Sequence, residues 1–189
     1  MGLRPAKCYR WDSPAYTRIA NNPGDSFITG VPGSKLNRFE MGNLSGEFDT
    51  EVSIITLEQV QIRSNALEAA RVAANKVLED SIGINNYRIK VRVFPHHVIR
   101  ENVMATGAGA DRVQMGMRQS FGKPMGTAAR MTAGQRIMTI YINKGEENMK
   151  KAKKAMKCAQ AKLPGASEVV ICPAKKKKVA KAAVAKVKQ

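Results

Sequence analysis

The chain has 189 residues, with 32 lysines and arginines against 15 acidic residues and a formal net charge of +17. A surplus of this size favours contact with a nucleic acid or an anionic membrane over a merely soluble basic protein. At 43% hydrophobic residues the chain can bury the core of one domain, whereas its 5% aromatic content argues against a broad aromatic platform for stacking bases.

The N-terminal residues 2–18 mix cations with aromatic side chains and show no regular periodicity. This mixture predicts an extended arm that lies on RNA, with an N-terminal strand packed on the domain as the alternative. The cations of the arm are Arg4, Lys7, Arg10 and Arg18. Turn signals at Asn22-Pro23-Gly24 and Val31-Pro32-Gly33 enclose a predicted short strand at 26–29.

A strand, a helix and a second strand are predicted next. Residues 51–62 predict a strand. Its expected core positions are Val52, Ile54 and Leu57. The apolar stripe over 63–81 predicts a helix, and the alternation over 87–93 predicts a strand whose apolar face packs on it. The other face of that strand carries a basic ladder, which is either solvated or in contact with phosphate. The ladder consists of Arg88, Lys90 and Arg92.

The C-terminal part continues the α+β pattern. Residues 136–142 predict a strand buried on both faces, residues 146–162 a helix coated with lysines, and residues 168–172 a final strand. Together these elements predict a two-layer α+β domain over residues 1–172, with two helices against a largely antiparallel sheet. Residues 173–189 contain no acidic or aromatic residue and predict a lysine-rich flexible tail.

The stretch from Met104 to Arg136 has no Leu, Ile, Tyr or Trp and therefore predicts no ordinary core element. Residues 100–136 hold six glycines and six lysines or arginines, which combine an adaptable backbone with a cationic surface. Such a segment inside a patterned domain is typical of a functional loop, here over 101–118, that contacts a polyanion.

Signals for catalysis and metal binding are weak. The three widely spaced cysteines lack a CxxC pairing and predict reduced thiols rather than zinc ligands. His96 and His97 are neighbours that a strand would point to opposite faces, so we interpret them as surface or RNA-contacting residues. Neither a GxxxxGK[ST] phosphate loop nor a nucleophile paired with His and Asp is apparent. We therefore predict no enzyme activity, metal or cofactor, and the absence of a signal peptide or transmembrane run predicts a soluble cytosolic protein.

Several motifs dispersed along the chain carry a family resemblance. In the glycine-rich segment they are Gly107-Ala108-Gly109-Ala110-Asp111-Arg112, Gly116-Met117-Arg118, Phe121-Gly122-Lys123-Pro124, Gly126 and Ala129-Arg130. Elsewhere they are Arg4-Pro5-Ala6-Lys7-Cys8-Tyr9-Arg10, Phe39-Glu40-Met41-Gly42-Asn43 and Pro95-His96-His97-Val98-Ile99-Arg100-Glu101-Asn102. Together they resemble the large-subunit ribosomal protein family L-ten-e, the archaeal and eukaryotic branch of universal protein uL-sixteen, over about residues 2–172. Met131 departs from the branched aliphatic residue expected there, and the lysine tail exceeds the family core.

The resemblance implies an α/β-hammerhead-type domain docked on large-subunit ribosomal RNA near the base of the central protuberance. It also implies a cytoplasmic location in the large subunit, with tRNA and neighbouring ribosomal proteins as further partners and neither a membrane nor a small-molecule substrate. The glycine-rich loop would point toward the peptidyl-transferase region, where family members help to position tRNA and the RNA performs the chemistry.

The residues and the resemblance together give two sets of candidate sites. The candidate ribosomal-RNA-binding residues are Arg4, Lys7, Arg10, Arg18, Arg88, Lys90, Arg92, His96, His97, Arg100, Lys123, Arg130 and Arg136. The candidate loop residues near tRNA and the peptidyl-transferase region are Gly107, Gly109, Asp111, Arg112, Gly116, Met117 and Arg118. The alternative functions are an extraribosomal RNA- or DNA-binding module and a nucleotide-dependent enzyme that uses the glycine-rich segment.

Overall fold

Two antiparallel sheets organise the chain in the computed structural model, which describes residues 4–5, 8–9, 13–102, 104–105 and 107–174. The larger sheet has the order β1 (Glu40–Gly42), β4 (Tyr87–Val91), β7 (Arg136–Ile142), β2 (Thr50–Thr56) and β8 (Ser167–Pro173). The smaller sheet has the order β3 (Val60–Arg63), β6 (Lys123–Met131) and β5 (His97–Glu101). The predicted α+β class is confirmed, but the strands form two sheets where a single one was expected.

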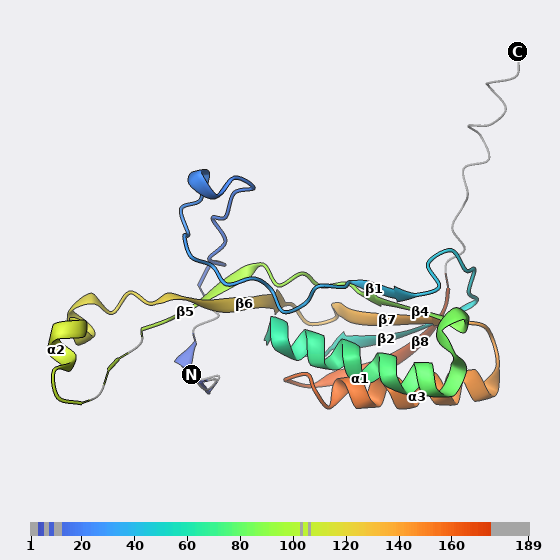
Figure 1. The fold of residues 1–189 in the computed structure, drawn as a ribbon. Helices are drawn as coiled ribbons and strands as arrows, with labels where there is room; N and C mark the ends of the chain where they lie inside the picture. Colours follow the sequence, from blue (N-terminus) through green and yellow to red (C-terminus); the bar gives the residue numbers. More distant parts are fainter. Residues whose placement is uncertain (1–3, 6–7, 10–12, 103, 106, 175–189) are drawn as a thin grey trace, which may run out of the picture.

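Helices α1 (Ser64–Ile82) and α3 (Glu146–Gln160) lie side by side on one face of the five-stranded sheet (Figure 1). The two helices are in close contact, and Ala70 and Ala74 of α1 and Ala152 and Ala155 of α3 are fully buried, so small side chains occupy the buried faces of both helices. Both helices match their predicted ranges to within two residues, and the apolar residues of β4 are buried beneath them, as expected.

The chain between residues 51 and 62 corrects one prediction. It forms two strands in different sheets, β2 and β3, rather than one long strand. Val52 and Ile54 are buried as expected, whereas Leu57 lies in the connection between the strands and is 56% exposed. The chain turns between β2 and β3 and passes from one sheet to the other. The alternation of apolar and polar residues therefore continues along the sequence but not along a single sheet face.

A second correction concerns residues 26–29, which form no strand. Ile28 is buried and donates its amide to the carbonyl of Arg18 at 3.2 Å, so a single side chain anchors this loop instead of a paired strand. Short 3₁₀ turns precede it at Pro23–Asp25 and follow α1 at Ile84–Asn86.

The glycine-rich segment contains more structure than its composition predicts. Its second half forms β6, which lies between β3 and β5 and buries Ala128, Ala129 and Met131. The expectation that this stretch supplies no core element is therefore wrong, because these three residues are buried. Its first half holds the short helix α2 (Ala110–Val113) and the 3₁₀ turn η4 (Gly116–Gln119) at the tip that extends farthest from α1 and α3 (Figure 1).

Strand β7 is buried on both faces over most of its length, as predicted, and β8 extends one residue beyond each end of its predicted range. Within the described part of the chain, no helix combines the length and the hydropathy needed to span a membrane.

Candidate nucleic-acid interface

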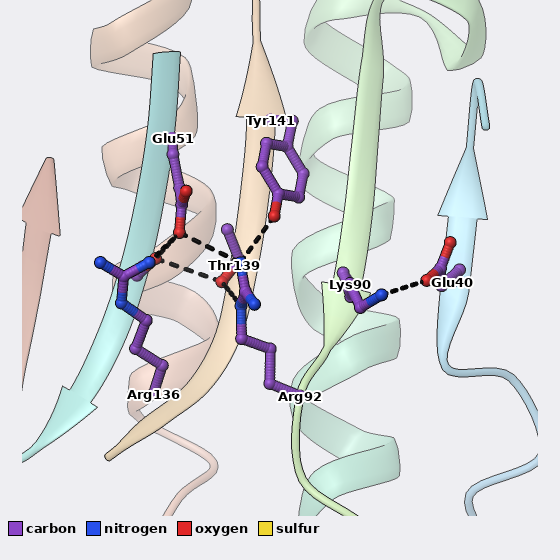
Figure 2. Close-up of polar contacts among 8 residues, drawn as sticks. Glu40, Glu51, Lys90, Arg92, Arg136, Thr139 and Tyr141 are labelled. Carbon is purple, nitrogen blue, oxygen red and sulfur yellow. Dashed lines mark hydrogen bonds and ion pairs between the residues drawn. The ribbon is translucent and has the colours of Figure 1, made fainter. Parts of the chain in front are cut away.

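The face of the five-stranded sheet opposite the helices carries an ion-pair network around Glu51 (Figure 2). The carboxylate of Glu51 is 7% exposed and accepts hydrogen bonds from Arg92 at 3.2 Å and from Arg136. Arg92 also donates to the hydroxyl of Thr139 at 2.7 Å and to that of Tyr141 at 2.6 Å. One buried carboxylate on β2 thus holds two arginines that come from β7 and from the end of β4.

A second carboxylate, that of Glu40, holds the other two cations of the ladder. Lys90 donates to Glu40 at 2.6 Å, and Arg88 pairs with its other oxygen. The hydrogen bond from Lys90, with a further one from Arg88, keeps the pKa of Glu40 below its ordinary value even though burial opposes this shift. Four cations on this face are therefore shared between two carboxylates, and the ladder is an internally paired network rather than a row of unpaired charges.

Tyr16 of the N-terminal arm lies against the second sheet beside His97. The amide of Tyr16 donates to Nδ1 of His97 at 2.9 Å, and the amide of Val98 donates to the carbonyl of Tyr16 at 2.9 Å. Since an amide can only donate, Nδ1 of His97 is the acceptor in the hydrogen bond with Tyr16. Burial, followed by the charge of the neighbouring Arg130, lowers the pKa of His97 to about 4.

His97 was expected at the surface, and this expectation is wrong, because the residue is 8% exposed. Its neighbour His96 is exposed and contacts the carbonyl of Phe94, so the two rings do point to opposite faces. His97 thus tethers the arm to β5 and offers little of its ring to a partner.

A cavity of about 940 Å³ opens between the arm and the base of the glycine-rich segment. Arg100 lines this cavity and packs on two aromatic rings. Its guanidinium carbon lies 4.4 Å from the ring centre of Tyr16 and 4.1 Å from that of Phe121. Glu101 beside it accepts a hydrogen bond from Tyr9 and pairs with Arg4 at 3.5 Å. Burial, with the hydrogen bond to Glu101, raises the pKa of Tyr9 to about 12.

The loop residues of the candidate site lie at the far end of the segment (Figure 1). Asp111 and Arg112 are exposed on α2, and Met117 and Arg118 are exposed on η4. Gly107, Gly109 and Gly116 all have positive φ angles, so the turns around α2 require conformations that other residues rarely adopt. Asn102 donates to the carbonyl of Gly116 at 3.5 Å and closes the base of the tip.

Most of the candidate residues in the described part of the chain therefore lie in one of three places: the sheet face, the cavity beside the arm, or the loop tip. Arg130 lines the cavity and donates to Gln61, Lys123 is exposed on β6, and Arg18 lies over the ring of Phe27 at 5.3 Å. Lys7 and Arg10 lie outside the described residues.

Sequence reasoning missed the packing of Tyr16 and Phe121 around Arg100. No local signal reveals it, because the three residues are far apart in the chain and meet through tertiary structure. Cys8, Cys158 and Cys172 are free, and among the described residues no three His, Cys, Asp or Glu side chains are grouped to hold a metal ion.

A model of the family described as "Ribosomal protein L16p/L10e" matches residues 12–170. The chain belongs to this family. It is similar to proteins called "Large ribosomal subunit protein uL16" from several archaea. The chain is 49% identical to the uL16 protein of Staphylothermus marinus over 176 residues. The aligned region covers 93% of this chain and 97% of the relative. The chain is also 49% identical to those of Methanocella arvoryzae, with 90% and 95% covered, and Metallosphaera sedula, with 94% and 99% covered. The resemblance drawn from the motifs is thereby confirmed.

Proposed function

We propose that this protein is a structural constituent of the cytoplasmic large ribosomal subunit, where it binds ribosomal RNA and helps to position tRNA near the peptidyl-transferase region. Family membership over residues 12–170 carries this proposal. The relatives bear the name of a large-subunit protein, and the excess of positive charge suits a partner rich in phosphate. Its role is binding and positioning, and the chemistry of peptide transfer belongs to the RNA.

The contacts with ribosomal RNA would come from the arm, the cavity and the sheet face. The residues we propose for them are Arg4, Lys7, Arg10, Arg18, Arg88, Lys90, Arg92, His96, Arg100, Lys123, Arg130 and Arg136. On the sheet face, the paired cations would present a fixed array to phosphates because Glu40 and Glu51 hold them in place. His97 would act indirectly, by holding the arm against β5.

The loop tip would be the part that acts on tRNA. It combines exposed Arg112 and Arg118 with the exposed side chains of Val113, Met115 and Met117, which are 64–80% exposed and contribute nothing to the core of their own domain. About nine residues of extended chain can cross about 30 Å, so a docked domain could reach a site well beyond its own surface.

We further propose that the lysine tail, outside the described residues, adds sequence-independent contact with RNA, and that neighbouring ribosomal proteins cover other surfaces.

Deletion of residues 105–116 with a short Gly-Ser bridge tests the role of the loop. The deletion removes no buried residue among those that the structure describes, and the contact of Asn102 with Gly116 shows that the two ends lie close together. We expect the variant to fold and to enter subunits, but to slow peptide-bond formation and reduce tRNA occupancy at the aminoacyl or peptidyl site. A second variant, Arg112→Gln with Arg118→Gln, separates loss of charge from loss of the segment.

Both variants should be compared with wild type on purified subunits of equal protein content. Equal peptide-bond formation and tRNA occupancy for the deletion and the wild type would leave this protein a scaffold and refute the positioning role. Failure of the wild-type protein to join large subunits would refute the proposed function as a whole.

A further inference from the structure

Helix α3 presents a row of lysines on the side that faces away from the sheet. Lys150, Lys153, Lys154 and Lys157 are all exposed, whereas Ala152, Ala155, Met156 and Ala159 on the opposite side of the helix are buried. The lysines follow the spacing i, i+3, i+4 and i+7, so they form one stripe along two turns of the helix. We call these four residues the α3 lysine stripe. It spans about 10 Å along the helix axis, at 1.5 Å per residue.

The α3 lysine stripe differs from the basic ladder in its partners. Each ladder cation pairs with Glu40 or Glu51, whereas none of the four stripe lysines makes an ion pair with any described residue of the chain. The acidic residues of α3 itself, Glu146 and Glu147, lie in its first turn. The cations of the ladder are therefore partly neutralised, whereas the α3 lysine stripe has no acidic partner among the described residues.

The requirements of the fold do not explain this row. Lysines three and four residues apart on a helix repel one another, so the stripe lowers the stability of the isolated helix. The helix dipole favours cations within the last turn, which accounts for Lys157 but not for Lys150, Lys153 or Lys154. A bound polyanion would turn this repulsion into a favourable interaction.

The chemistry of the surface indicates what kind of polyanion fits. The stripe lines a shallow groove of about 540 Å³ together with Cys158 and Ala161, and this lining contains no aromatic ring, amide or carboxylate. Such a lining has no group that stacks on a base or reads a base edge, and lysine acts on phosphate as a compact charge without a fixed hydrogen-bonding plane. Double-stranded RNA is recognised largely through its backbone, so its phosphates match this surface.

We propose that the α3 lysine stripe is a docking surface for the phosphate backbone of a double-stranded segment of large-subunit ribosomal RNA. This inference rests on the proposed function and adds to it a further RNA-binding face, on the side of the sheet opposite the ladder. The domain would then be held between RNA segments on its two layers.

Quantitative binding of the full chain to large-subunit ribosomal RNA transcribed from Staphylothermus marinus tests this surface. The test variant replaces Lys150, Lys153, Lys154 and Lys157 by Gln. The control variant replaces Lys35, Arg38, Lys76 and Lys144 by Gln. These four residues are also exposed and lie outside α3, and their replacement removes the same amount of charge. We expect the test variant to lose at least tenfold in affinity and its log–log salt slope to become shallower by about 3, because each lost phosphate contact lowers it by about 0.7–0.9. The control should change both quantities far less.

The melting temperature of the free proteins distinguishes docking from folding. Removal of the repulsion should leave the melting temperature of the test variant unchanged or raise it, so weaker RNA binding cannot then be assigned to a damaged fold. Equal losses of affinity in the test and control variants would show that net charge alone matters and would overturn the proposal. Unchanged RNA binding with weaker entry into subunits would also overturn it and would point to an acidic protein neighbour. If the wild-type protein itself fails to bind this RNA, the proposed function fails together with the inference.

Cys158 provides an independent test because it lies within the groove. A protein with Cys8→Ser and Cys172→Ser keeps Cys158 as its one thiol, to which an iron chelate that cleaves nearby RNA can be attached. We expect cleavage on both strands of one duplex, relative to the same protein without chelate. Absence of cleavage, or cleavage confined to single-stranded RNA, would contradict the proposed partner.

Discussion

A β-carbon on Gly122 would lie 2.7 Å from the carbonyl carbon of Glu101 and 2.8 Å from its nitrogen. The chain that leaves the loop tip therefore passes directly against the end of β5, and only a residue without a side chain fits there. The neighbouring residue Phe121 packs its ring on Arg100. The chain that enters the glycine-rich loop and the chain that leaves it are therefore joined by a backbone contact at Gly122 and by a cation–π contact at Phe121.

Gly122→Ala should lower the free energy of unfolding by about 1–3 kcal/mol, the usual cost of forcing extra volume into a packed site. Gly126→Ala is the matched control, because a β-carbon at Gly126 meets nothing within 4 Å. Chemical denaturation of both variants checks this expectation. If the two variants were equally stable, the backbone around Glu101 would have to be more adaptable than the contact implies.

Glu51→Gln should be more destabilising than Glu40→Gln. Glu51 is 7% exposed and serves two arginines, so its replacement removes two charge-assisted hydrogen bonds, at about 1–3 kcal/mol. The side chain of Glu40 is 30% exposed, and its pairs should contribute less than about 1 kcal/mol. Urea unfolding of both variants gives the comparison, and the reverse order would show that solvent screening does not separate the two networks.

The contribution of Glu40 should also depend on pH. Its pKa is lowered in the folded protein, so the folded state favours the charged carboxylate and the contribution is complete above the ordinary carboxyl pKa. It should disappear as the pH falls through the lowered value, and the stabilities of wild type and Glu40→Gln should then converge. A difference that stayed constant down to acid pH would rule out an ionic origin.

His97 should make the protein less stable in mild acid. Its folded pKa of about 4 lies below the ordinary value of 6.5, so the unfolded chain binds more protons between these values and stability falls as the pH decreases through that window. Between pH 7 and pH 5 the loss should be on the order of 1–2 kcal/mol. Urea unfolding of wild type and His97→Gln at the two pH values measures it, and the variant should show the smaller change. The same pH dependence in both proteins would assign the effect to other groups.

Close approach of α1 and α3 depends on alanine. Ala74→Leu should cost about 1–3 kcal/mol, because Ala74 is fully buried among close neighbours. Ala69→Leu on the exposed side of the same helix is the control and should change stability by less than about 0.5 kcal/mol. Thermal unfolding of both variants would detect the difference, and a stable Ala74→Leu protein would mean that the helices can separate without loss of packing.

The sequence predicted the elements whose pattern is local. The helix of residues 64–82 follows from an apolar stripe with a period of 3.6 residues, and β4 follows from alternation with a period of two. Prediction failed at Leu57 because the alternation continues through residues that turn from one sheet to the other. Prediction failed at β6 because alanine is a weak signal for a strand. Ala128 and Ala129 are nevertheless buried, because the tertiary structure covers them.

The same distinction applies to the candidate site. Composition and motifs determined the family, the basic character and the position of the glycine-rich segment, because each is a property of the chain read residue by residue. Tertiary structure alone decided which charges are neutralised: Glu51 meets Arg136, and Glu40 meets Arg88 and Lys90, across strands that are distant in sequence. It also decided that His97 is buried while the four lysines of the α3 lysine stripe stay exposed and without acidic partners among the described residues. The physical reason is that Coulomb interactions and desolvation depend on distances and burial in space, which a sequence does not contain until it has folded.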